Sequence, residues 1–249
     1  MASEGDSNAV TLEQRMEEVE RRLADACARS GRNRSDIGLI AVTKYVGIEQ
    51  TQNVLRHGLT HMGENRWQDA ADKWNAITGS GWDRSLEQAP AGQAVWHFIG
   101  SLQTNKVKDV IGKFTYIHSL DRLSLAQAIE RRAEQLGLVV PCFLQVNVSG
   151  EASKHGLAPE ALVPFAAELS ALRHIKPVGL MTMAPIDAEG EQTRPVFRGL
   201  RELRDELNGK AVLPEPVAGL SMGMSGDFEI AVEEGATWLR LGTVLVGKS

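Results

Sequence analysis

A lysine at the end of the first apolar segment is the residue of this sequence best suited to covalent chemistry. The segment reads IGLIAVT over residues 37–43, and Lys44 follows it directly. Alternation along a strand puts Lys44 on the same side as Ile40 and Val42. If that side faces an apolar interior, desolvation favours the neutral amine, which is the form that attacks an aldehyde. The alternative is a lysine whose charged end reaches solvent beyond the strand.

Two later segments are rich in small residues and backbone donors, a pattern typical of phosphate binding. The first reads GLSMGMSGD over residues 219–227, and the second reads RLGT over residues 240–243. Small residues let the backbone approach a ligand, and free N–H groups at the start of a helix favour an anion. Ordinary turn glycines, with an N-cap at Ser225 or Asp227, are the alternative interpretation.

An arginine in the last of these segments also needs a partner. Arg240 shares its strand face with Trp238, and an arginine directed into a buried site requires an acceptor. A pyridine nitrogen would serve, because an arginine beside it keeps the nitrogen unprotonated and weakens the ring as an electron sink. Such a site holds a cofactor but stabilises carbanions poorly. Together with Lys44, these segments fit a phosphorylated aldehyde, with donors at one end and an amine at the other.

The elements that must position these residues follow from the hydrophobic pattern. Short runs rich in Val, Ile and Leu alternate with longer, charged stretches of helical spacing, which predicts a parallel sheet. The expected strands are Ile37–Val42, Leu59–Gly63, Val95–Ile99, Tyr116–Ser119, Val139–Val148, Val178–Thr182, Val217–Ser221 and Thr237–Leu241. The expected helices are Ile48–His57, Arg66–Ile77, Leu102–Ile111, Leu123–Leu136, Pro159–Leu172, Glu191–Leu207 and Gly226–Glu234.

A further helix is expected at Thr11–Ser30, ahead of the first strand. It places Leu12, Met16, Val19, Leu23 and Ala26 on one face. We expect it to complete the outer ring of a closed (β/α)8 barrel, as a single domain with the α/β fold class. In such barrels the loops after strands seven and eight commonly hold phosphate. An open, doubly wound sheet with two edges is the alternative.

Composition limits the classes of function. Of the 249 residues, 43% are hydrophobic and 24% charged, as in an ordinary globular protein. A net charge of −5 disfavours nucleic-acid binding. The two cysteines, Cys27 and Cys142, fit neither a disulfide framework nor a paired metal site, so we expect a cytoplasmic protein without a metal. The sequence contains neither an export signal nor 18 consecutive apolar residues, so no membrane segment is expected.

Two segments fall outside the expected barrel. Residues 1–9 are predicted to form a disordered tail, so that the domain spans residues 10–249. The stretch TGSGWDRSLEQAPAGQA at residues 78–94 is rich in Gly, Ser, Ala and Pro. It is predicted to be a surface insertion between the second helix and the third strand.

Several motifs in order make the sequence recognisable. They are AVTK at 41–44, GEN at 63–65, WHFIGSLQTNK at 96–106, SGEASKHGL at 149–157, GLMTMAP at 179–185 and LSMGMSGDFEIAVEEGATWLRLGT at 220–243. From Ile37 to Gly247 the chain closely resembles the pyridoxal phosphate homeostasis protein family, which is similar to the N-terminal domain of alanine racemase. Two departures are a Val before Gly247 and the 78–94 insertion, and neither touches the expected site.

The resemblance implies a fold-type III barrel with pyridoxal 5'-phosphate bound as a Schiff base to Lys44. It also implies that Ser221, Gly223, Gly242 and Thr243 hold the phosphate and that Arg240 faces the ring nitrogen. Asn65 and Met181 are expected to contact the ring from the ends of strands two and six. A functional and a solvated role for Lys154 remain equally open.

Enzymes with a similar barrel add a C-terminal β-domain, whereas this sequence ends six residues past Thr243, so we expect no second domain and a monomer.

Racemisation needs acid and base groups on opposite faces of the substrate adduct, and Lys44 supplies one. Neither Tyr45 nor Tyr116 is placed for the other role, and His97 is more simply a hydrogen-bonded core residue. The first hypothesis is therefore a non-catalytic carrier of pyridoxal phosphate that meets amino acids and apo-enzymes. A weak amino-acid racemase is the second. A phosphate-sugar enzyme is the third, and it leaves Lys44 without a role.

Overall fold

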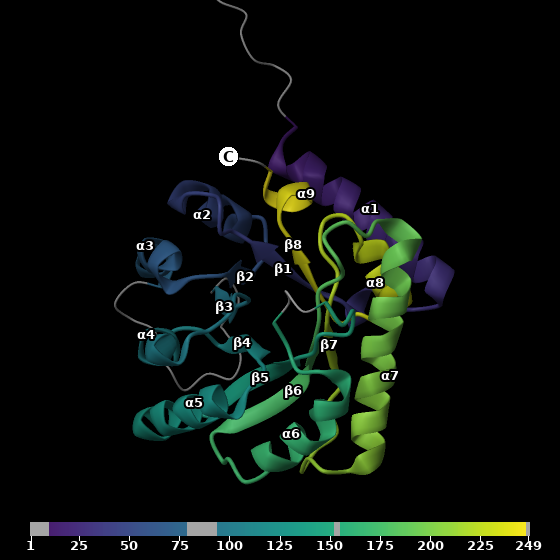
Figure 1. Cartoon of the computed structure of the whole chain (residues 1–249). Coiled ribbons are helices and arrows are strands. Elements are labelled where there is room, and N and C mark those ends of the chain that lie inside the picture. The colour runs from purple at the N-terminus through teal and green to yellow at the C-terminus, as the bar shows by residue number, and fades with distance from the viewer. Residues whose placement is uncertain (1–9, 79–93, 152–154, 248–249) are drawn as a thin grey trace, which may run out of the picture.

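The computed structural model describes residues 10–78, 94–151 and 155–247, and its strands form one closed barrel. The predicted tail and nearly all of the predicted insertion lie outside this part of the chain. All strand pairs are parallel and follow chain order, and β8 closes the sheet against β1 (Figure 1). The strands are β1 (Gly38–Val42), β2 (His61–Glu64), β3 (Val95–Phe98), β4 (Tyr116–Leu120), β5 (Val140–Gln145), β6 (Ile175–Met181), β7 (Gly219–Ser221) and β8 (Trp238–Leu241). The predicted single (β/α)8 barrel is confirmed.

Helices surround the barrel and cover its outer face (Figure 1). They are α1 (Leu12–Ser30), α2 (Ile48–Arg56), α3 (Trp67–Thr78), α4 (Val107–Val110), α5 (Leu123–Leu136), α6 (Leu162–Leu169), α7 (Arg194–Lys210), α8 (Phe228–Glu233) and α9 (Thr243–Val246). Short 3-10 turns are η1 (Arg34–Asp36), η3 (Thr104–Lys106), η4 (Pro159–Ala161) and η5 (Gly190–Thr193). Within the described residues, no helix is both long and apolar enough to cross a membrane.

The N-terminal helix α1 takes the place predicted for it in the outer ring. The Thr11 side chain accepts a hydrogen bond from the Gln14 backbone N–H, and the Gln14 side chain accepts one from the Thr11 N–H, which caps the helix start. Its predicted apolar face is buried except for the partly exposed Met16, and it packs beside α8 and α9 (Figure 1). Arg22 on α1 donates to Glu229 on α8 at 2.6 Å, and this bond also holds α1 against α8.

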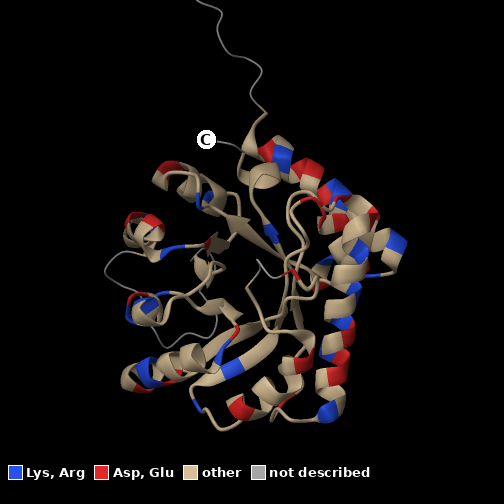
Figure 2. Cartoon of the chain, in the orientation of Figure 1, with Lys and Arg blue, Asp and Glu red and all other residues tan. Residues whose placement is uncertain are grey.

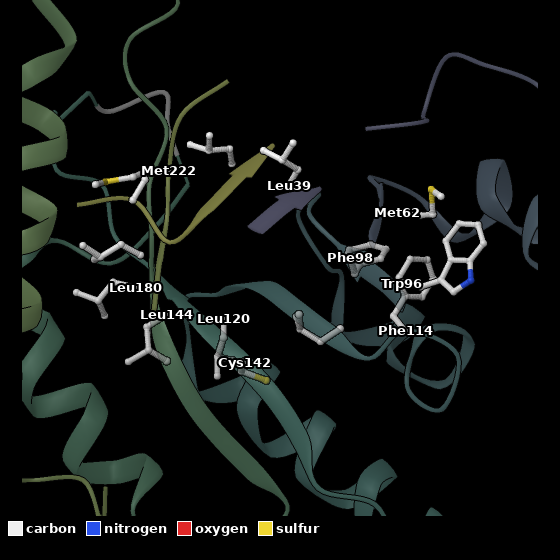
Figure 3. Close-up of a cluster of buried hydrophobic side chains, with 14 of the residues drawn as sticks. Leu39, Met62, Trp96, Phe98, Phe114, Leu120, Cys142, Leu144, Leu180 and Met222 are labelled. Carbon is white, nitrogen blue, oxygen red and sulfur yellow. The ribbon is translucent and has the colours of Figure 1, made fainter. Parts of the chain in front are cut away.

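Along each strand, alternate residues face two different apolar regions: the space between the sheet and the helices, and the barrel interior. Leu39 and Ala41 belong to the cluster between the sheet and the helices, while the neighbouring Ile40 is buried outside that cluster. Figure 3 shows part of the outer cluster, with Trp96, Phe98 and other side chains from successive strands. Alternation therefore leaves Ile40, Val42 and Arg240 on the inner face, as predicted for the strand that leads to Lys44.

The two largest differences from the predicted strand boundaries are at the end of β5 and the start of β6. β5 ends at Gln145 instead of Val148, because the chain turns back and Leu157 N–H donates to the Gln145 carbonyl at 2.8 Å. β6 begins three residues earlier than expected, at Ile175, and contains Pro177. The register with β5 shifts beside that proline, which lacks the N–H that a regular ladder needs.

Most helices also differ from their predicted bounds, and only Leu123–Leu136 has the bounds expected for it. The expected helix Leu102–Ile111 is a 3-10 turn followed by four residues of α-helix, since Gln103 is still extended, with ψ 140°. A short helix, α9, follows β8 and was not predicted. Charged residues of both signs lie mainly on the outer helices, as Figure 2 shows for α1 and α7, and the barrel strands carry few.

Candidate functional site

Lys44 lies where the sequence analysis placed it, just past the C-terminal end of β1. Ala41 pairs with Leu241 of β8, and the Thr43 N–H donates to the Gly63 carbonyl of β2 at 3.1 Å. Lys44 is partly exposed, and its Nζ lies 4.9 Å from the centre of the Tyr45 ring, which is itself exposed. The lysine therefore stands at the barrel mouth between the ends of β8 and β2, within reach of a ligand.

A buried ion pair fixes the residue before this lysine. Lys73 Nζ of α3 lies 2.5 Å from Glu64 Oε1 and donates to the Thr43 carbonyl at 2.8 Å. The Thr43 hydroxyl donates to the same Glu64 oxygen at 2.7 Å. Glu64 and Thr43 are fully buried and Lys73 nearly so. The ion pair thus holds both the backbone and the side chain of Thr43 and limits the positions that Lys44 can adopt.

The loops after β7 and β8 meet at the same end of the barrel. The Val244 N–H donates to Ser225 Oγ at 3.4 Å, which joins the two loops. Gly242 and Thr243 lie at the start of α9, where the first N–H groups of a helix have no acceptor within it. Such a pair of loops with a short extra helix is the arrangement in which barrels of this kind bind phosphate. Ser225 joins the predicted Gly242 and Thr243 as a candidate contact.

Gly223, expected to be a phosphate contact, has a conformation that shapes the loop after β7. Its φ is +91°, and an added Cβ would lie 2.6 Å from the Ala231 Cβ and 2.9 Å from a Leu239 methyl. No side chain fits there, so the glycine lets the loop pass close to α8. Asp227, at the start of that helix, accepts from the Met224 N–H at 2.5 Å, and burial raises the pKa of its carboxyl.

Arg240 lies in the barrel interior beneath these loops. It is 4% exposed, donates to Ser221 Oγ at 2.6 Å and to the Thr182 carbonyl at 2.8 Å, and burial lowers its pKa to about 10. It therefore remains charged at neutral pH. An arginine carries five N–H donors, so these two bonds leave donors for a ligand. Ser221, predicted as a phosphate contact, is fully buried, and its hydroxyl is held by Arg240 and, at 2.9 Å, by His118.

Asn65 and Met181 flank the mouth from the ends of β2 and β6. Asn65 is partly exposed, and Met181 is buried and pairs in register with Ser221. Asn65 also lines a cavity of about 870 Å³ on the β2–β5 side of the mouth. Lys44 and the β7–β8 loops do not line that cavity. Its lining includes the cationic Arg66, Lys106 and Arg122, together with His155.

Sequence reasoning missed three contributors to this region. The Glu64–Lys73 ion pair joins residues from two elements, and only the glutamate lies in a singled-out motif, GEN. Ser225 was considered only as an N-cap. His61 and His118 were not considered, although His97 was correctly expected to be a hydrogen-bonded core residue, since it is fully buried with both ring nitrogens bonded. Lys154 lies outside the described residues. Among the described residues, no group of three His, Cys, Asp or Glu side chains is arranged to hold a metal ion.

Comparisons with known proteins agree with this geometry. The sequence model of the family described as "Alanine racemase, N-terminal domain" matches residues 17–249. The chain is 43% identical over 235 residues to a protein of Aquifex aeolicus named pyridoxal phosphate homeostasis protein, covering 94% of this chain and 97% of that one. It is 38% identical to a protein of the same name from Pseudomonas aeruginosa, covering 95% of each.

A solved structure shows the same similarity. PipY of Synechococcus elongatus, in a structure with pyridoxal phosphate bound, matches with a TM-score of 0.77 and 35% identity. The match covers 92% of this chain and all of that chain.

Proposed function

Because this chain belongs to the alanine racemase N-terminal domain family, and within it to the pyridoxal phosphate homeostasis proteins, we propose that it is a non-catalytic carrier of pyridoxal 5'-phosphate. In this proposal the cofactor is bound as a Schiff base to Lys44. The protein buffers the reactive aldehyde, which links it to vitamin B6 and amino-acid homeostasis.

One observation carries the proposal: the parallel pairing of β8 with β1 brings the Arg240 guanidinium and the Lys44 amine to one end of the barrel. Ile40 pairs with Arg240, and the position of a Cβ on Gly242 would lie 3.8 Å from the Val42 Cβ. Lys44 is two residues beyond Val42. The buried Arg240, with donors to spare, is the partner that a pyridine nitrogen accepts from, so the residues present fit pyridoxal phosphate.

Each part of the cofactor has proposed partners in this structure. Ser225, Gly242 and Thr243 hold the phosphate with hydroxyl and backbone donors, and Gly223 gives their loop its path. Arg240 faces the ring nitrogen, and Ser221 supports Arg240. Asn65 and Met181 lie beside the ring. When bound, the cofactor supplies an aldehyde that condenses with amines, and the chain's residues orient it and keep Lys44 close.

The site favours a carrier over a racemase. Racemisation needs acid and base groups on opposite faces of the substrate, and Tyr45, which contacts the Lys44 ammonium, lies on the lysine's own side. Both ring nitrogens of His97 are hydrogen-bonded in the interior, and Tyr116 stacks on that ring at 4.7 Å. A weak racemase remains the second candidate, because the partly exposed Lys44 supplies one of the two groups that racemisation needs.

The test is a spectral titration of cofactor-free protein with pyridoxal phosphate, followed by incubation with D- and L-alanine. Wild type is compared with Lys44→Ala and with Lys108→Ala, an exposed lysine on α4 that serves as the matched control. We expect the visible band of a lysine Schiff base in wild type and control, its loss in Lys44→Ala, and no racemisation.

The other outcomes separate the alternatives. Turnover of alanine by the wild type would replace the carrier with the racemase. The absence of a visible band in all three proteins would contradict the cofactor assignment itself. The proposed partners beyond the cofactor are amino acids and apo-enzymes, and the proposed state in solution is a monomer. Sedimentation equilibrium of the loaded protein, with and without an apo-enzyme, checks both.

A further inference from the structure

A line of hydrogen-bonded side chains crosses the barrel interior and ends at the proposed cofactor site. His61 Nδ1 lies 2.8 Å from His97 Nε2, and His97 Nδ1 lies 2.9 Å from His118 Nε2. His118 Nδ1 lies 2.9 Å from Ser221 Oγ, which accepts from Arg240. The line therefore joins β2, β3, β4, β7 and β8, and the proposed function uses only its last two members. We call His61, His97 and His118 the histidine relay.

The relay is buried and uncharged. His97 and His118 are fully buried, and burial holds the pKa of both imidazoles well below the ordinary value of 6.5. The charge of Arg240 lowers the pKa of His118 further, and burial also lowers that of the half-buried His61. A neutral imidazole has one N–H donor and one acceptor nitrogen. In a line of such rings, every imidazole must donate its hydrogen bond toward the same end of the line.

Arg240 fixes that direction. Its guanidinium can only donate, so Ser221 Oγ is the acceptor in their hydrogen bond. The Ser221 proton then has His118 Nδ1 as its acceptor. In turn, His118 Nε2–H donates to His97, and His97 Nε2–H donates to His61. If the rings ran the other way, the Ser221 proton would have no acceptor among the described residues, and a buried donor without a partner is costly.

Packing holds the rings in this arrangement. His118 stacks on Phe143 of β5, with ring centres 4.3 Å apart and planes 20° from parallel. His61 and His97 both contact Trp238 of β8, at 4.6 and 5.3 Å between ring centres. Trp238 is two residues before Arg240 on the same face of the strand. The relay and the arginine are thus parts of one packed layer, and displacing one ring disturbs the others.

We propose that the histidine relay positions Arg240 for the pyridine ring, by holding Ser221 with its proton toward His118 and its lone pair toward the guanidinium. The inference rests on the proposed function, since it names further positioning residues for the same site. No proton leaves the chain in this role. Each histidine keeps one N–H, and the relay acts through the orientation of Ser221 and Arg240.

The first test needs no cofactor. Nitrogen-15 NMR of histidine-labelled, cofactor-free protein reports which ring nitrogen carries the proton. We expect all three relay histidines to be protonated on Nε2. In Ser221→Ala, which removes the donor to His118, we expect a share of His118 to become protonated on Nδ1. A wild-type His118 protonated on Nδ1 would overturn the proposal, because the direction would then not come from Arg240.

The second test reads the bound cofactor. His118→Phe keeps a ring beside Phe143 but removes both nitrogens, and we expect about tenfold weaker binding of pyridoxal phosphate and a shifted visible band. His118→Asn keeps a polar atom near the Nδ1 position, and we expect it to restore most of the affinity and the wild-type band. His174→Phe removes a histidine bonded to Glu130 outside the relay and serves as the control.

The outcomes distinguish positioning from mere stability. If His118→Phe lowered stability as His174→Phe does but left the affinity and the band at wild-type values, the relay would be only structural and the proposal would be wrong. If wild type bound no pyridoxal phosphate, the proposed function would fail. The NMR measurement would then still decide the direction of the relay.

Discussion

Ser221 and Ser225 lie four residues apart on one segment, yet they meet different neighbours. Ser221 is buried against Arg240, whereas Ser225 joins the loop that begins α9. The sequence analysis assigned Ser221 to the phosphate through the family resemblance and considered Ser225 only as an N-cap. Their partners come from β4, β8 and α9, and no pattern within the segment encodes those contacts.

We predict that Ser225→Ala weakens the binding of pyridoxal phosphate about tenfold, as loss of one hydrogen bond to a charged group does. The binding of pyridoxal, which lacks the phosphate, should stay unchanged. Competition titrations with both ligands measure this difference. Thr104→Ala, an exposed hydroxyl on η3, is the control. Equal losses for both ligands would show that Ser225 does not contact the phosphate.

Helix α3 holds Thr43, the residue before Lys44, through the buried Lys73. Removing one partner of a buried ion pair leaves the other charge uncompensated. We predict that Lys73→Met lowers the free energy of unfolding by about 3–5 kcal/mol in urea titrations. Lys108→Met, on the exposed face of α4, should change it little. A loss of similar size in both variants would contradict the role of the pair.

A second variant tests the ion pair by also removing the charge of Glu64, the partner of Lys73. Glu64→Gln in the Lys73→Met background keeps an acceptor for the Thr43 hydroxyl and removes the lone charge. We predict that the double variant recovers much of the lost stability. Additive losses, measured by the same urea titrations, would mean that the two side chains act independently.

The loop between β7 and α8 depends on one glycine. We predict that Gly223→Ala costs about 1–3 kcal/mol, because a φ of +91° and the contact with Ala231 both disfavour a side chain. Gly226→Ala, three residues on, has no atom within 4 Å of an added Cβ and should cost far less. Thermal unfolding of both variants provides the comparison, and similar midpoints would contradict this account of the loop.

At the element scale, the sequence predicted order and type better than extent. Leu123–Leu136 was predicted with its observed bounds, since it is strongly amphipathic and ends at Gly137 in the left-handed conformation. The start of β6 was missed, because Lys176 and Pro177 are unusual in a strand and are accommodated by a shift in register against β5. Such compensation depends on the neighbouring strand.

For the whole molecule, closure of the barrel was predictable because eight apolar runs alternate with helical stretches. The histidine relay was not, because its members come from separate strands and their meeting depends on strand register. The relay also affects the stability of the whole fold, because it buries imidazoles that take up protons more readily in the unfolded chain.

That property predicts how stability depends on pH. The folded-state pKa values of His97 and His118 lie well below the ordinary 6.5, so the unfolded chain binds more protons as the pH falls. Stability should therefore decrease below about pH 6.5, by up to about 1.4 kcal/mol per pH unit for each histidine. Urea titrations between about pH 7.5 and 5.5 measure the slope. His155→Gln, at an exposed site, is the control and should leave the slope of unfolding free energy against pH unchanged. An unfolding free energy that does not vary with pH in the wild type would contradict this prediction.

The central claim is that Lys44 forms the covalent bond with the cofactor. The most direct measurement is borohydride reduction of the protein loaded with pyridoxal phosphate, followed by proteolysis and mass-spectrometric mapping of the pyridoxyl group. We predict that the label is found on the peptide that contains Lys44, and that a cofactor-free sample carries none. Label distributed over surface lysines, or found mainly on a lysine other than Lys44, would contradict the account.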